Sequence, residues 1–167
     1  MTDTSKSKND AFVDRLIKIC GDRGSTAELR RFWSPTTRHY AYPVLGRLGV
    51  ANPQLPDAIV AALYAINPHH ANGGATLGKA CLNLAGDSGF ESFEPHMRRL
   101  LSSDDLPELG GQLHRIFKRL ERERIALDYN KLAWNLRNWG KKSDEVKTRW
   151  AMDFWKAPAE LLNIQDA

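Results

Sequence analysis

The chain has 167 residues, with 24 Lys and Arg against 20 Asp and Glu, which gives a net charge of +4 and a pI of about 9.2. This length suits one domain, or two small lobes around a shared core, and it buries enough surface to fold without a disulfide or a metal. The composition is 42% hydrophobic and 26% charged, which is typical of a globular protein and excludes a disordered or fibrous chain.

We expect neither a membrane span nor export. No run of about 18 apolar residues occurs, which excludes a membrane-spanning helix. The first residues, MTDTSKSKND, lack the apolar stretch of a secretory signal. We therefore expect a cytoplasmic protein in which Cys20 and Cys81 are reduced residues of the core.

The first part of the chain predicts two capped helices. Asn9 or Asp10 is a suitable cap for the first of them, and Gly21 is a suitable end. Ser25 and Glu28 have the spacing of a capping box, in which both side chains bind free backbone N–H groups at the start of a helix. We therefore expect the second helix to begin at Ser25 and to reach about residue 33.

Further helices follow, separated by loops rich in glycine, proline and asparagine. We expect them over residues 36–48 with an interruption near Pro43, then 57–65, 75–84, 94–101, 108–124, 128–139 and 143–155. Leucine and alanine, 20 and 18 residues, far outnumber valine and isoleucine, 5 and 7, and no segment alternates as a strand does. The prediction is an all-α fold, a two-lobed helical bundle of about eight to nine helices.

The clearest break in the sequence is the segment from Gly86 to Gly89. We place a lobe boundary there, between an N-terminal lobe over 9–88 and a C-terminal lobe over 89–156. Residues 1–8 are polar and are expected to be disordered, and 157–167 form a tail.

The positive charge is concentrated in one stretch. Residues 96–149 carry 13 basic and 8 acidic side chains, whereas residues 1–95 carry 10 and 9. On the helix expected over 108–124, an arc about 100° wide is apolar, and an arc of similar width roughly opposite is basic. The basic arc consists of Arg115, Lys118, Arg119 and Arg122.

These four cations repel one another unless water or an anion screens them. A phosphate backbone would do so, so we favour a polyanion such as nucleic acid as the partner, with salt-dependent binding. Two other interpretations stay open, namely a solvated helix face and an acidic protein partner.

Two segments resemble functional sites, a phosphate-binding loop and a metal site, but we interpret both as structural. The stretch from Gly73 to Ala80 nearly matches a phosphate-binding loop, but Ala80 stands where that loop needs a hydroxyl for magnesium. His69 and His70 are adjacent and so lack the spacing of metal ligands on a helix. The other histidines stand in no recognisable nucleophile motif. We therefore expect no enzyme, no metal and no cofactor.

Trp134 lies roughly opposite the apolar residues Tyr129, Leu132 and Leu136 of its helix. Either the core surrounds this helix on both faces, or Trp134 contacts a partner subunit. We favour the core.

Several short motifs, in their order and spacing between Phe12 and Phe154, resemble a known family. They are Ala27-Glu28-Leu29-Arg30-Arg31, Tyr42-Pro43, Asn52-Pro53, Gly74-Ala75-Thr76-Leu77-Gly78-Lys79-Ala80, Gln112-Leu113-His114-Arg115-Ile116-Phe117, Leu127-Asp128-Tyr129, Trp139-Gly140-Lys141-Lys142 and Trp150-Ala151-Met152-Asp153-Phe154. Together they resemble the small subunit, CasB, of Cascade, the type I-E CRISPR RNA-guided surveillance complex.

The resemblance implies an all-helical, two-lobed subunit without catalytic activity. It implies two copies that lie head to tail along a crescent of backbone subunits, in a complex with guide RNA and a large subunit. It also implies that the basic surface binds the target strand and the displaced strand without sequence preference, while base pairing reads the sequence.

The family motifs assign nucleic-acid binding to four positions of this chain, which are Arg31, Lys79, Arg115 and Lys142. Helical geometry and proximity add Arg30, Lys118, Arg119, Arg122 and Lys141. His114 stands where the family pattern suggests a basic residue, so we expect part of the charge there to depend on pH. The competing functions are a free-standing DNA-binding regulator and a protein-only scaffold.

Overall fold

The computed structural model describes residues 10–86 and 88–156, so the expected disordered start over 1–8 and the tail over 157–167 lie outside the described residues. The described part is built from α-helices and two short 3-10 helices, with one isolated bridge between His70 and Leu127. The all-α prediction is confirmed. None of the helices in these two ranges is long and apolar enough to cross a membrane.

The elements follow the order expected from the sequence. They are α2 (Ala11–Ile19), α3 (Arg23–Arg30), η1 (Arg31–Trp33), η2 (Arg38–Ala41), α4 (Tyr42–Arg47), α5 (Pro56–Ile66), α6 (Leu77–Ala85), α7 (Phe90–Leu101), α8 (Leu106–Arg122), α9 (Tyr129–Arg137) and α10 (Trp139–Phe154). The interruption expected near Pro43 is the change from the 3-10 helix η2 to α4.

The capping box predicted at Ser25 is wrong. α3 begins earlier, and its N-cap is Asp22, whose carboxylate accepts hydrogen bonds from the backbone N–H and the hydroxyl of Ser25, both 2.9 Å long. An aspartate caps as well as a serine does, and its charge is stabilised by the positive end of the helix dipole. Ser25 is instead buried inside the first turn, where its hydroxyl also accepts a hydrogen bond from Arg47.

The last helix also starts earlier than expected. α10 begins at Trp139, and a kink at Lys142, with φ −130° and ψ 37°, separates its first turn from the rest. The helix start predicted at Ser143 therefore marks the segment after the kink.

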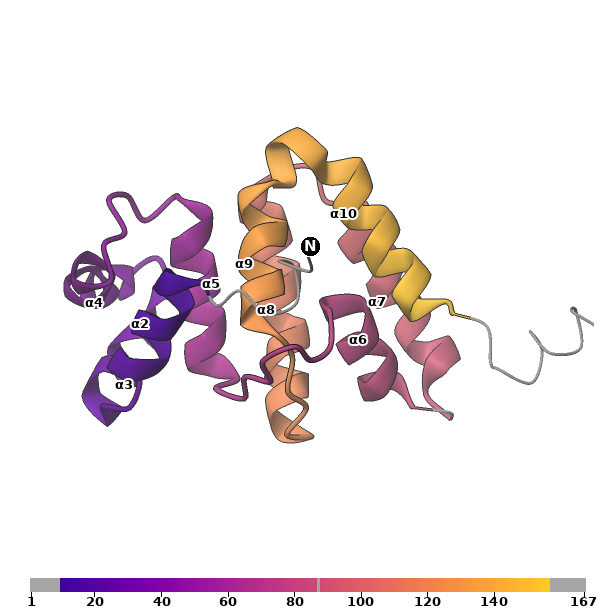
Figure 1. The fold of residues 1–167 in the computed structure, drawn as a ribbon, viewed down its shortest axis with the longest axis horizontal. Coiled ribbons are helices and arrows are strands. Elements are labelled where there is room, and N and C mark those ends of the chain that lie inside the picture. The colour runs from indigo at the N-terminus through magenta and orange to yellow at the C-terminus, as the bar shows by residue number, and fades with distance from the viewer. Residues whose placement is uncertain (1–9, 87, 157–167) are drawn as a thin grey trace, which may run out of the picture.

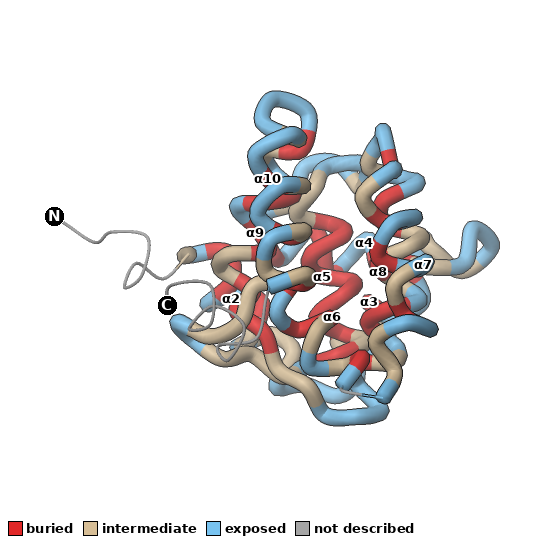
Figure 2. The backbone as a smooth tube through the Cα atoms, turned by 90° about the vertical axis from the view of Figure 1, so that its right-hand side faces the viewer, coloured by how far each residue is buried: buried red, intermediate tan, exposed pale blue. Residues whose placement is uncertain are grey.

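Helix α5 lies at the centre of the fold. Eight consecutive residues, 58–65, are buried, and four of them are alanine, which lets neighbouring helices approach closely. α5 packs against α3, α8 and α9. In Figure 1, α8 and α9 stand between α2 to α5 on one side and α6, α7 and α10 on the other. Figure 2 shows the buried backbone gathered around α5.

Helix α6 makes its main contacts with α10, α7 and α8. A Cβ atom on Gly78 would lie 2.2 Å from the carbonyl oxygen of Trp150, so the approach of α6 to α10 requires glycine here. The side chain of Thr76 donates a hydrogen bond to Asp153 across the same seam. The lobe boundary near residue 88 stays a prediction. With that boundary, α6 belongs to the N-terminal lobe but packs mainly against helices of the C-terminal lobe.

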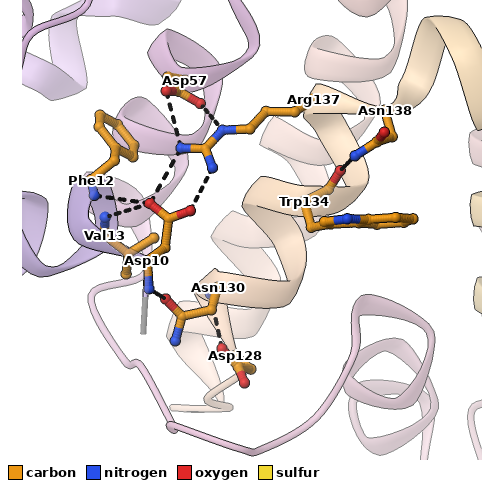
Figure 3. Close-up of polar contacts among 9 residues, drawn as sticks. All are labelled: Asp10, Phe12, Val13, Asp57, Asp128, Asn130, Trp134, Arg137 and Asn138. Carbon is orange, nitrogen blue, oxygen red and sulfur yellow. Dashed lines mark hydrogen bonds and ion pairs between the residues drawn. The ribbon is translucent and has the colours of Figure 1, made fainter. Parts of the chain in front are cut away.

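The start of the described chain is tied to the centre by one arginine. Arg137, at the end of α9, forms ion pairs with Asp10, the N-cap of α2, and with Asp57, in the first turn of α5 (Figure 3). The backbone N–H of Asp10 also donates to Asn130 over 2.9 Å. Three helices thus meet at Arg137, whose charge is compensated by the two carboxylates.

Candidate nucleic-acid interface

The amphipathic helix predicted over 108–124 is α8. Asp105 caps it by accepting a hydrogen bond of 2.8 Å from the N–H of Glu108, and Pro107 lies in the first turn, where no backbone donor is needed. Its apolar face is buried and consists of Leu109, Leu113, Ile116, Phe117 and Leu120. On the opposite face Arg115, Lys118 and Arg122 are exposed, and Arg119 is half-buried.

Arg119 leans against α7. Its guanidinium carbon lies 5.0 Å from the centre of the Phe93 ring, a cation–π distance. Beside it a cleft of about 170 Å³ opens between the two helices, lined by His96, Arg99, Gln112, Arg115, Ile116 and Arg119. Two of the residues predicted from the sequence, Arg115 and Arg119, are therefore brought together at one concave site.

His114 lies beside this basic face but does not add to its charge at neutral pH. Its imidazole stacks on the Trp33 ring, with centroids 4.4 Å apart and planes 7° from parallel. Burial, together with the neighbouring charges of Lys118 and Arg115, lowers the pKa of His114 to about 4. The pH-dependent charge that we expected at His114 therefore arises only well below neutral pH. The stacking also fixes η1, which contains Arg31, against α8.

The two arginines predicted from the Leu-Arg-Arg run have different environments. Arg30 donates from Nε to the carbonyl oxygen of Ala65 over 2.8 Å, which ties the end of α3 to the end of α5. The Arg31 guanidinium lies over the Tyr40 ring, 4.6 Å from its centre, and the residue is exposed. Arg31 is therefore the more available of the two for a partner.

The corner between α9 and α10 carries two further predicted cations, Lys141 and Lys142, both exposed. The ammonium group of Lys142 lies 5.7 Å from the centre of the Trp134 ring. Trp134 is 43% exposed, so the prediction that it belongs to the core is wrong. The core at this corner contains Trp139 and Trp150 instead, and the buried indole of Trp150 donates a hydrogen bond to Asn135 of α9. Figure 3 shows Trp134 and the hydrogen bond from Asn138 to its carbonyl.

Lys79 is exposed in the first turn of α6, in the segment that nearly matches a phosphate-binding loop. That segment has a structural explanation. Thr76 caps α6 by accepting a hydrogen bond from the N–H of Lys79 over 3.3 Å, and Gly78 allows contact with α10. His70 likewise supports the fold, because its Nδ1 accepts a hydrogen bond of 3.1 Å from the backbone N–H of Tyr129.

The cysteines fit a reduced core. Cys81 is buried, and burial raises the pKa of its thiol to about 12, so it is protonated and unreactive at neutral pH. Cys20 is half-buried, and burial raises the pKa of its thiol as well. Both are free thiols.

Comparison with known proteins shows which family the chain belongs to. The model of the CRISPR-associated protein Cse2 family matches residues 25–155 of the chain. The chain belongs to the Cse2 family. No curated protein matches it.

Solved structures share this fold. A Cse2-family protein from Thermus thermophilus is 25% identical, with a TM-score of 0.67 over 87% of this chain and 96% of that chain. CasB from Thermobifida fusca is 23% identical, with a TM-score of 0.67 over 86% and 95%. A chain of a CRISPR RNA-guided surveillance complex is 21% identical, with a TM-score of 0.69 over 95% and 96%.

The segment that matches the Cse2 family contains all nine cations predicted from the sequence. The structure distributes them over α3 and η1, α6, α8 and the start of α10. Sequence reasoning missed His96, Arg99 and Gln112, which complete the cleft around Arg115 and Arg119. The excess of basic residues over 96–149 was a signal, but the periodicity of a single helix does not show which residues of two helices face each other.

Proposed function

We propose that this member of the Cse2 family is a non-catalytic, cytoplasmic subunit of a CRISPR RNA-guided surveillance complex. The family match and the shared fold with a chain of such a complex support this assignment. Its partners there are the guide-RNA-containing complex with its backbone and large subunits, and a second copy of the chain.

In this role the subunit binds the target strand and the displaced strand without reading their sequence, and so stabilises the opened duplex. The observation that carries the proposal is the basic face of α8. Arg115, Lys118 and Arg122 are exposed on one side of a helix whose other side is buried, and none of them forms an ion pair within the described residues. Cations held at helical spacing suit a phosphate backbone, whose binding releases counterions.

Filter binding of random single- and double-stranded DNA over a salt series tests the proposal. We expect weak, sequence-independent binding that falls steeply as salt rises. A Lys118→Gln and Arg122→Gln double variant should lower the slope of log K against log salt by about 1.4 on single strands, at about 0.7 per phosphate contact. The matched control is Lys18→Gln with Arg23→Gln, because these cations are also exposed but lie on α2 and α3.

Three outcomes contradict the proposal. Binding to one DNA sequence about a thousandfold tighter than to random DNA would indicate a free-standing regulator. If the slope of log K against log salt is unchanged in the α8 double variant, the basic face of α8 does not contact the nucleic acid. Absence of guide RNA and larger complex subunits after affinity purification from the native host would argue for a scaffold with other partners.

A further inference from the structure

The cleft between α7 and α8 concentrates positive charge on a concave surface. His96 and Arg99 come from α7, and Arg115 and Arg119 come from α8. The remaining lining residues are Gln112, whose amide offers further donors, and Ile116, which closes the floor as part of the core. No carboxylate lines the cleft within the described part of the chain.

These cations have no compensating partner within residues 10–86 and 88–156. Neither Arg99, Arg115 nor Arg119 forms an ion pair there. Glu94, a carboxylate of α7, binds Arg98 over 3.3 Å and the Trp155 indole over 2.7 Å instead. Like charges that are held together without a counter-charge destabilise the free protein, and an anion in the cleft would relieve that cost.

The geometry is suited to a phosphate group. Planar guanidinium groups bind phosphate oxygens through two parallel hydrogen bonds, and three arginines line this cleft. The cleft volume of about 170 Å³ is well below the roughly 300–1,000 Å³ of pockets for drug-sized ligands. It therefore suits one phosphate group of a strand and is too small for a whole nucleotide.

His96 is the titratable member of this cluster. Its Nδ1 lies 3.5 Å from Nη1 of Arg99, and its ring centre lies 5.6 Å from that of Phe93. The charged groups that face it are Arg99 on α7 and Arg119 and Arg115 on α8, all cationic. Burial and the charges of Arg119 and Arg99 lower the pKa of His96, so the imidazole is neutral in the empty cleft at neutral pH.

We propose that the α7–α8 cleft binds one phosphate group of a nucleic-acid strand, and that His96 takes up a proton when the phosphate enters. This inference rests on the proposed function and adds both a subsite and its regulation by pH. A phosphate anion beside the imidazole favours the protonated form, so binding of the strand and binding of the proton strengthen each other. Affinity for the strand therefore rises as the pH falls.

The test measures binding of a labelled single-stranded oligonucleotide of about fifteen thymidines, a length near the upper end of the roughly 4–16 nucleotides that one OB fold covers. Fluorescence anisotropy is recorded between about pH 5.5 and 7.5 at constant ionic strength, a range that brackets the ordinary histidine pKa. An increase of about one unit in the pKa of His96 on binding corresponds to a tightening that approaches about tenfold once the pH lies below both pKa values, so binding should tighten severalfold across this range. The variant His96→Gln should abolish most of this pH dependence.

Arg99→Gln tests the phosphate contact. We expect it to weaken binding and to lower the salt slope by about 0.7, the value for one phosphate on a single strand. Arg98→Gln is the matched control, because Arg98 is the adjacent exposed arginine but pairs with Glu94 outside the cleft. Circular dichroism and thermal unfolding of each variant establish that the fold is retained.

The outcomes separate this inference from the proposed function. If the oligonucleotide binds with the salt slope carried by Lys118 and Arg122, but Arg99→Gln behaves as Arg98→Gln does, the cleft is not the subsite and the proposed function stands. A His96→Gln variant with the full pH dependence would overturn the proton uptake. If Arg99→Gln removes binding of inorganic phosphate but leaves oligonucleotide binding unchanged, the cleft serves a small anion and the inference is wrong.

Discussion

Substituting Gly78 by alanine tests how closely α6 and α10 approach each other. The new Cβ would lie 2.2 Å from the Trp150 carbonyl oxygen, 2.9 Å from its carbon and 3.0 Å from Cβ of Asp153. Ordinary contact begins at 3.4 Å, so the first of these distances is more than 1 Å too short. Two of the three atoms belong to the α10 backbone, so no side-chain rotation relieves the clash and the helices must separate.

The magnitude follows from two opposing effects. Alanine in a helix is favoured over glycine by about 1 kcal/mol. Overpacking of a tight contact costs about 1–3 kcal/mol, and a clash with backbone lies at the upper end of that range. Separation of the helices also stretches the hydrogen bond from Thr76 to Asp153. We expect a net loss of about 2 kcal/mol in the free energy of unfolding, which lowers Tm by about 4–8 °C in a chain of this size.

Thermal unfolding followed by circular dichroism measures this effect. The matched control is Gly111→Ala in α8, where a Cβ would meet nothing within 4 Å. There alanine should raise the free energy of unfolding by about 0.5–1 kcal/mol, because only the helix preference changes. The reasoning about the α6–α10 seam is refuted if Gly78→Ala raises Tm as Gly111→Ala does.

Three further predictions concern Trp134, the Arg137 ion pairs and His114. Trp134→Ala should change the free energy of unfolding by less than about 0.5 kcal/mol, because the indole is exposed. Trp150→Ala should lower the free energy of unfolding by about 3–5 kcal/mol, because this indole is fully buried. Urea titrations measure both values. A double-mutant cycle of Asp10→Asn and Arg137→Gln should give a coupling free energy of about 1 kcal/mol, because both side chains are partly exposed. A coupling near zero would contradict a stabilising ion pair between α2 and α9. By NMR, His114 should titrate near pH 4. The unfolded chain takes up this proton at about pH 6.5 and the folded chain near 4, so the free energy of unfolding should fall as the pH drops between those values. A titration of His114 near pH 6.5 would contradict its burial against Trp33.

Local features were predicted well where one helix decides the outcome by itself. The division of α8 into a buried apolar face and an exposed basic face follows from side-chain spacing along 3.6 residues per turn, and the structure has the same division. The start of α3 was predicted wrongly because Asp22 and Ser25 both cap helices, and only the buried position of Ser25 beside Arg47 selects Asp22.

The near match to a phosphate-binding loop shows a similar ambiguity. A glycine before a lysine occurs both in such loops and where two helices approach closely. The sequence excluded the loop because Ala80 has no hydroxyl, but the reason for Gly78 appears only when α10 is packed against α6.

The sequence by itself determined the helical class, the order of the elements and the basic face of α8, since each depends on residues within a few turns of one another. Tertiary structure alone decided which tryptophan is buried and which is exposed at the α9–α10 corner. It alone placed His96 and Arg99 opposite Arg115 and Arg119, because a site between two helices depends on how their faces are rotated and packed together.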